Sequence, residues 1–234
     1  MTRRDFIGGC TALAASAALG KPRRSSIGGR RNCSNGNGLP YDSEVEYIES
    51  TGTQWIDTEI IPDSSIGLAV TGRFPRFQGF TRIGSRYAIN SGQFCILSVA
   101  TNGIRFDMGS GNSDSTQWEV QSDATEVHLN ARLKAARLVG LTGEEYSHNF
   151  EPTMSFSHFP ILIFAFNNNG TPAIARGMVV SRVKISKRQV IIRDMIPVRF
   201  TNEYGSTEGA MYDLISGEVF RNKGSGSFII GPDV

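Results

Sequence analysis

The chain has 234 residues, of which 39% are hydrophobic and 20% are charged, a composition typical of globular proteins. It has no run of 18 apolar residues, which excludes a spanning helix, and its 3 Cys and 3 His exclude a disulfide framework and argue against a zinc cluster. Seven of the 24 Lys and Arg residues, but one of the 22 Asp and Glu residues, lie within 1–40. The rest of the chain therefore carries about four net negative charges, which argues against nucleic-acid binding and favours neutral ligands over polyanions.

The first twenty residues have the layout of an export signal: a basic start, a weakly apolar stretch and then small residues. Arg3 and Arg4, followed one residue later by Phe6 and Ile7, resemble the bacterial twin-arginine signal. The alternative is a general secretory signal, in which the two arginines supply only positive charge. In both cases we expect an exported protein that is periplasmic, secreted or on the cell surface, without a transmembrane segment in its mature form.

A linker is expected next. Residues 21–40 combine Gly, Ser, Asn and Arg with almost nothing apolar, so burial cannot offset the entropy lost on ordering them. We therefore expect a signal peptide at 1–20, a flexible linker at 21–40 and a single domain at 41–234.

Short segments with alternating apolar residues follow one another throughout 41–234, separated by Gly, Asn, Asp or Pro. Asn-Gly dipeptides within 101–103 and 168–170 predict tight turns between neighbouring strands. The expected strands are 45–49, 54–58, 66–74, 80–83, 93–99, 103–108, 116–121, 126–131, 135–139, 145–150, 160–166, 179–186, 189–196, 210–214 and 218–220.

Alternation also predicts which side chains are buried. In 126–131 the odd-numbered residues should face the core, and in 179–186 we expect Val179 inside and Val180 outside. So many strands exceed what one flat sheet holds, whereas two stacked sheets bury both inner faces. The predicted fold class is all-β, a two-sheet antiparallel sandwich of the jelly-roll type.

Several segments resemble a known group of proteins. Residues 46–58, EYIESTGTQWIDT, preceded by Leu39-Pro40, resemble the opening of concanavalin A-like, laminin-G-like jelly-roll domains found in bacterial exported and tailed-phage proteins. The resemblance implies the jelly-roll fold, but little about activity, because that fold carries lectins, glycanases and adhesion modules alike. It continues in the segments FAFNNNG (164–170), SRVKI (181–185), RDMIP (193–197) and GAMYDL (209–214).

One acidic run invites a catalytic interpretation. Glu44, Glu46 and Glu49 have a spacing close to that of jelly-roll β-glucanases, where the outer carboxylates act as nucleophile and acid. A retaining glycosidase needs its two carboxyl groups about 5–5.5 Å apart, yet strand alternation places Glu49 on the face opposite Glu44. The run also lies in the opening strand, so we expect a solvated strand face and no enzyme activity.

Calcium is the one metal that the sequence leaves open. Asp107, Asn112 and Asp114 lie in or beside a loop rich in Gly and Ser and could offer oxygen ligands. Asp and Asn are also common turn residues, and three side chains fall short of the six to eight oxygens that calcium takes. We expect no other cofactor.

A glycan site needs an exposed aromatic ring beside hydrogen-bonding side chains. Trp118, with Gln117 and Glu119 beside it, is the best candidate; the alternative is that Trp118 fills the core. Tyr87 and Asn90, near a turn, are weaker candidates. We therefore expect a noncatalytic binding module for a glycan or a surface protein. A structural or adhesion protein without a small-ligand site, or a glycanase, are the alternatives.

Overall fold

The computed structural model of the protein describes residues 38–89, 91–99, 103–110, 115–120, 122–151 and 155–234. The expected signal peptide and most of the expected linker lie outside these residues. In the described part of the chain there is no helix that could span a membrane.

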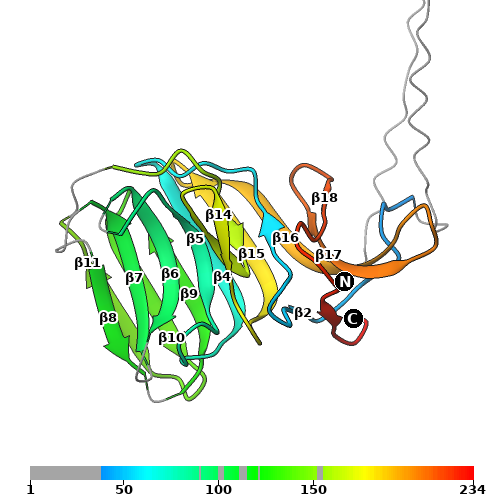
Figure 1. Ribbon diagram of the computed structural model, residues 1–234, viewed down its shortest axis with the longest axis horizontal. Helices are drawn as coiled ribbons and strands as arrows, with labels where there is room; N and C mark the ends of the chain where they lie inside the picture. The colour runs from blue at the N-terminus through cyan, green and yellow to red at the C-terminus, as the bar shows by residue number, and fades with distance from the viewer. Residues whose placement is uncertain (1–37, 90, 100–102, 111–114, 121, 152–154) are drawn as a thin grey trace, which may run out of the picture. The chain divides into compact units, whose positions relative to one another are not determined.

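The described residues form two β-sheets and no helix, as expected from the alternation of apolar residues (Figure 1). The larger sheet runs in the order β11 (Glu145–Asn149), β10 (Ala135–Gly140), β9 (Ala124–Asn130), β4 (Ile66–Phe74), β15 (Val179–Lys187), β16 (Val190–Thr201), β17 (Thr207–Asp213) and β18 (Val219–Phe220), with β1 (Ser43–Glu44), β2 (Ile48–Glu49) and β19 (Ile229–Ile230) attached. The smaller sheet runs β14 (Thr171–Ile174), β13 (Ala165–Asn168), β5 (Arg82–Arg86), β6 (Gln93–Val99), β7 (Gly103–Gly109) and β8 (Ser115–Glu119), with β12 (Leu162–Ile163) and β3 (Ile56–Asp57) attached.

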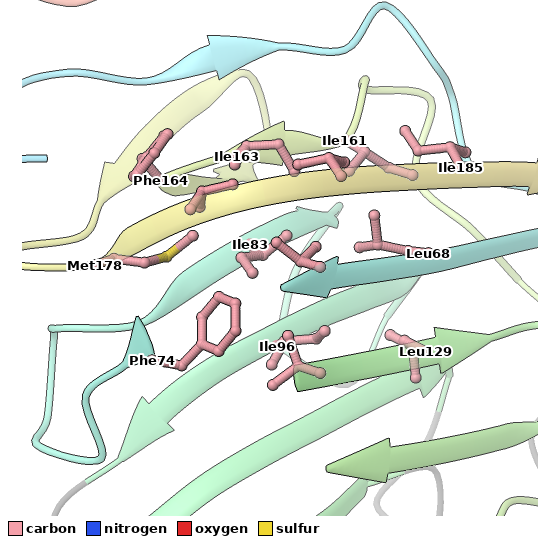
Figure 2. Close-up of a cluster of buried hydrophobic side chains, with 14 of the residues drawn as sticks. Leu68, Phe74, Ile83, Ile96, Leu129, Ile161, Ile163, Phe164, Met178 and Ile185 are labelled. Atoms are coloured by element: carbon pink, nitrogen blue, oxygen red, sulfur yellow. The ribbon is translucent and has the colours of Figure 1, made fainter. Parts of the chain in front are cut away.

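The hydrophobic core fills the space between the two sheets. Leu68 and Leu129 from the larger sheet and Ile83 and Ile96 from the smaller sheet point toward one another in Figure 2, and all four are almost completely buried. Complete burial of one such side chain contributes about 1.5–3 kcal/mol to stability. The two-sheet sandwich is confirmed, and every second residue of each strand is left to the outer faces.

Val180 differs from the expected alternation. It is completely buried, whereas Val179, which we expected inside, is only half-buried. The pairing of β15 with β4 shifts by one residue between Val180 and Arg182. This β-bulge reverses which side chains face the core on its two sides, and sequence alternation alone could not place it.

The expected strand 160–166 is divided into β12 and β13. Phe164 lies between them with a φ of 66°, in the left-handed region that a bulky residue rarely adopts. Its ring is buried 4.7 Å from the ring of Phe228. The break allows β12 to pair antiparallel and β13 to pair parallel with β5. The resulting β5–β13 pairing places Phe166 and Asn168 beside the residues of β5.

The turn expected at 168–170 is confirmed. Asn169 and Gly170 both have positive φ, 51° and 85°, as a two-residue turn between β13 and β14 requires. Past the sandwich, the second half of β16 pairs with β1 and β17 around a second apolar cluster of Tyr41, Val198 and Ala210. In Figure 1, β17 and β18 lie at the end of the molecule opposite β8 and β11.

Candidate functional site

Trp118 lies on the inner side of β8, at the edge of the sandwich. Its half-buried ring packs 5.0 Å from the ring of Phe106 and 5.7 Å from the ring of Tyr146, measured between centroids. Because Tyr146 belongs to β11, the contact joins the open edges of the two sheets. Gln117 and Glu119 are exposed on the opposite face of β8, so the three side chains do not share one rim.

The other expected ligand residues are separated along the smaller sheet. Tyr87 is 54% exposed at the end of β5, and Asn90 lies outside the described residues. Asp107 is buried, and its Oδ1 lies 2.5 Å from Nε of Arg105. Its expected partners in calcium binding, Asn112 and Asp114, lie outside the described residues.

The acidic run is distributed over different strands. Glu44 lies on β1, which pairs with β16, while Glu49 lies on β2, which pairs with β15 and β19; Glu46 is exposed between them. Glu44 accepts a hydrogen bond from the Tyr41 hydroxyl, and burial together with this carboxylate raises the pKa of Tyr41 to about 12. No group of three acidic, His or Cys side chains suited to a metal ion occurs in the described part of the chain.

The outer face of the larger sheet pairs opposite charges with one another. Arg182 on β15 makes two hydrogen bonds of 2.8 Å to Asp194 on β16, which hold the pKa of that carboxyl below its usual value. Arg137 on β10 contacts both Glu126 and Glu145. Each such exposed pair contributes at most about 1 kcal/mol to stability. Together they neutralise several, though not all, of the charges on this face, since Arg73 and Lys184 make no ion pair with a described residue. Further pairs join His128 to Glu126 and Lys187 to Asp63.

The outer face of the smaller sheet has a different composition. Ile83, Phe94 and Ile96 face the core, so the intervening residues of β5 and β6 point outward. The outward side chains therefore include two arginines of β5, placed two residues on either side of Gly84. In sequence order the outward residues of these strands and of β7 are Arg82, Arg86, Gln93, Cys95, Leu97, Arg105 and Asp107.

Phe166 anchors the two β5 arginines. It is the parallel register partner of Gly84. Gly84 has a φ of 112°, and any side chain there would collide with the backbone carbonyl of Phe94. The Cζ atom of Arg86 lies 4.5 Å from the centroid of the Phe166 ring, and that of Arg82 lies 5.8 Å away. Both distances are within the range of a cation–π contact, so the ring supports the two guanidinium groups together.

Hydrogen bonding orients Arg86 but leaves most of its donors unused. Its Nε donates to Oδ1 of Asn168, 2.9 Å away on β13. A guanidinium has five N–H donors in a planar fork, so its two terminal nitrogens remain available. Arg86 makes no ion pair with any described residue.

Arg82 and Arg176 add to the positive charge. Burial lowers the pKa of Arg82, and the positive charges of Arg86 and Arg176 lower it further. Arg82 is half-buried, yet neither a hydrogen-bond acceptor nor an ion-pair partner for it lies among the residues that the structure describes. We call Arg82, Arg86, Arg176 and Phe166 the arginine cluster.

Two further outward residues border the cluster. Gln93, which precedes Phe94, the register partner of Ser85, is completely buried, and neither atom of its amide has a hydrogen-bond partner within the described chain. Arg105 is neutralised by Asp107 and also donates to the Ser115 hydroxyl. The arginine cluster therefore keeps its positive charge, although the domain as a whole is acidic.

A cavity of about 380 Å³ lies elsewhere, beside β3 and β18. Its lining mixes acids and bases, and one of them, Arg221, is already paired with Glu208. The lining residues are Asp57, Glu59, Glu218, Val219, Phe220, Arg221 and Lys223.

Sequence reasoning missed the arginine cluster, although part of its signal was present. The segment Arg82-Ile83-Gly84-Ser85-Arg86 places two arginines on one face of a strand, with a glycine between them. The contribution of Phe166, eighty residues later, depends on the parallel pairing of β13 with β5. No local pattern predicts that pairing.

No known protein family and no curated protein matches the chain. Among solved structures, a chain described as "Ruminococcus gnavus IT-sialidase CBM40" is 16% identical over 62% of this chain and 91% of that chain, with a TM-score of 0.42. The same module bound to alpha2,3 sialyllactose is 15% identical over 64% of this chain and 94% of that chain, also with a TM-score of 0.42. Similarity at this level does not transfer a ligand to this chain.

Proposed function

We propose that this protein is an exported, noncatalytic binding module of the concanavalin A-like, laminin-G-like kind. Its ligand is a glycan, bound on the outer face of the smaller sheet at the arginine cluster. Export rests on the signal layout of residues 1–20, and the domain type rests on the resemblance of residues 46–58 to that group.

The observation that carries the proposal is the difference between the two outer faces. Most arginines that point outward from the larger sheet face a carboxylate across the strands, as Arg182 faces Asp194, although Arg73 and Lys184 have no ion-pair partner among the described residues. On the smaller sheet Arg82 and Arg86 have no carboxylate partner among the described residues. Polar groups that are partly withdrawn from water without a partner reduce stability, so a protein that keeps them commonly uses them for recognition. Planar donors beside exposed aromatic side chains suit a ligand with many hydroxyl groups.

Exposed rings border the arginine cluster. Tyr87 directly follows Arg86 and is exposed, and Phe80 is 38% exposed where its ring approaches Gly177, next to Arg176. The Phe80 ring can contact the C–H face of a sugar while the guanidinium groups bind its oxygens, and Tyr87 can add a contact from the turn that follows β5. Arg82 and Arg86 are partly exposed on a face where Gln93, Asp107 and Phe166 are covered, so a ligand would reach the guanidinium groups and the bordering rings.

The absence of catalysis is part of the proposal. Glu44 and Glu49 lie on strands that pair with different neighbours, Glu44 opposite Val198 and Glu49 opposite Val179, so the fold does not hold them as one catalytic pair. Release of reducing sugar from β-glucans, abolished by Glu44→Gln or Glu49→Gln in a folded protein, would instead establish a glycanase.

Binding to an array of neutral and acidic glycans tests the function. The wild-type protein should bind at least one glycan, and the double variant Arg82→Gln/Arg86→Gln should lose that binding. Arg137→Gln, on the outer face of the larger sheet, is the matched control and should bind like the wild type. Binding to no glycan would favour a structural or adhesion protein. Equal binding by all three proteins would place the site elsewhere.

A further inference from the structure

Arg82 and Arg86 carry positive charge that no described residue neutralises through an ion pair. Arg82, Arg86 and Arg176 lie close enough to affect one another electrostatically. Asp107, the acidic residue among the outward positions of β5, β6 and β7, is already bound to Arg105, and the Glu49 carboxylate lies beside Gly177 and Phe80, next to Arg176. Like charges held together on a rigid sheet repel one another, and an anion placed among them removes that repulsion. The local charge is therefore opposite to the net charge of the domain.

The unused donors specify the kind of anion. Asn168 binds Nε of Arg86, which fixes the plane of the guanidinium and leaves its two terminal nitrogens side by side. Two parallel N–H groups in one plane match the two oxygens of a carboxylate. Arg82 is held against the same ring of Phe166 and has none of its donors engaged by a described residue. The guanidinium of Arg86 is thus oriented before a ligand arrives, and that of Arg82 lies beside the same ring with all its donors available.

We propose that the arginine cluster binds a carboxylate group of an acidic saccharide, with Arg82 and Arg86 as the residues that select it. This inference rests on the proposed function and adds the substrate class. Phe166 and Asn168 act as positioning residues, because they hold the guanidinium groups in place. The Phe166 ring is only 5% exposed, so its role is to support the arginines and not to contact the ligand. At the border of the cluster, the Tyr87 hydroxyl can hydrogen-bond to sugar hydroxyl groups, and the Phe80 ring can pack against the sugar ring carbons.

The test compares each acidic saccharide with its neutral counterpart, using the full-length protein in isothermal titration calorimetry. The pairs are oligogalacturonate with its carboxyl-reduced form and sialyllactose with lactose, and dextran sulfate serves as a non-carboxylate polyanion. We expect at least one acidic member to bind, with affinity at least about tenfold above that of its neutral partner. Arg86→Gln should remove that difference, whereas Arg137→Gln should keep it.

Arg82→Lys and Arg86→Lys distinguish bidentate hydrogen bonding by the guanidinium from attraction by positive charge alone. Lysine keeps the positive charge but cannot make two parallel hydrogen bonds, so each variant should lose most of the preference for the acidic member. Circular dichroism and thermal melting confirm that the variants are folded, and Arg73→Lys, an exposed arginine on β4, is the matched control.

Other outcomes overturn the inference in distinguishable ways. Equal binding of acidic and neutral partners, lost in Arg82→Gln/Arg86→Gln, would contradict the carboxylate but keep the glycan site. Equally tight binding of dextran sulfate, unaffected by lysine substitution, would show general attraction to polyanions. Binding of neutral glycans alone would also contradict the carboxylate, and binding to no saccharide would contradict the proposed function as well.

Discussion

The guanidinium carbon of Arg86 lies 4.5 Å from the centroid of the Phe166 ring, although the two residues are eighty positions apart in the chain. The contact exists because β13 runs parallel to β5 and places Phe166 opposite Gly84, where no side chain intervenes. A guanidinium held on an aromatic face loses little additional freedom when it binds a ligand. The fold thus prepares Arg86 for recognition at a site remote from the core.

Gln93 provides a test of stability that is independent of binding. Its buried amide has no described partner, so its desolvation cost is not recovered. We expect Gln93→Met, which keeps the length of the side chain but removes the amide, to raise the free energy of unfolding by about 1 kcal/mol. Urea denaturation measures the change, and Gln78→Met, at an exposed position, is the control. A loss of stability in Gln93→Met would mean that a bound water or another group satisfies the amide.

Asp194 should contribute to stability in a pH-dependent way. The hydrogen bonds from Arg182 lower its pKa in the folded state, so the folded protein binds fewer protons than the unfolded chain. The contribution is therefore complete above the unfolded pKa of about 4 and is lost as the pH falls through the folded pKa.

Asp194→Asn should then reduce stability at pH 7 by about 1 kcal/mol, because Arg182 is partly exposed and the pair is screened by solvent. The difference from the wild type should vanish near pH 2. Urea midpoints measured between pH 2 and pH 7 check this, with Glu203→Gln at an exposed turn as the control. A constant difference at every pH would contradict the assigned role of the ion pair.

Trp118 distinguishes packing from ligand binding. Because its ring joins Phe106 to Tyr146 across the two sheets, we expect Trp118→Ala to lower the free energy of unfolding by about 2–3 kcal/mol. Glycan binding by the folded fraction should stay close to that of the wild type. If Trp118→Ala instead leaves the melting temperature within a few degrees and abolishes binding, Trp118 belongs to the ligand site.

Much of the sandwich could be predicted from local patterns, because strands with one buried face impose a period of two on the sequence. The bounds of β4 and β6 agree with the expected 66–74 and 93–99 for this reason. The break at Phe164 and the bulge after Val180 could not be predicted, since both arise from packing between distant segments.

The candidate site was harder to predict than the fold. The sequence indicates Trp118 and Tyr87 as aromatic residues with polar neighbours, and only Tyr87 lies next to the arginine cluster in sequence. Arg82 and Arg86 share a face by simple alternation, yet most exposed arginines on strands are paired with acids. Whether these two are paired depends on the residues across β6 and β13, which only the three-dimensional structure places beside them.

Export can be tested by exchanging one basic residue for another. If Arg3 and Arg4 form a twin-arginine signal, the double substitution to Lys should block export, because a general secretory signal needs only positive charge. Cell fractionation and immunoblotting in a bacterial host measure the distribution of the protein. Unchanged export of the double variant would identify a general secretory signal. Retention of the wild-type protein in the cytoplasm would contradict export itself.

The measurement that tests the central claim most directly is hydrogen–deuterium exchange of the full-length protein with and without its best-binding acidic saccharide. Binding at the arginine cluster predicts slower exchange in peptides covering β5, β6 and β13, with no change in β9 and β10 on the opposite face. In Arg82→Gln/Arg86→Gln the saccharide should produce no protection at its previous concentration. Protection confined to β9 and β10, or to the cavity beside β3 and β18, would contradict the account.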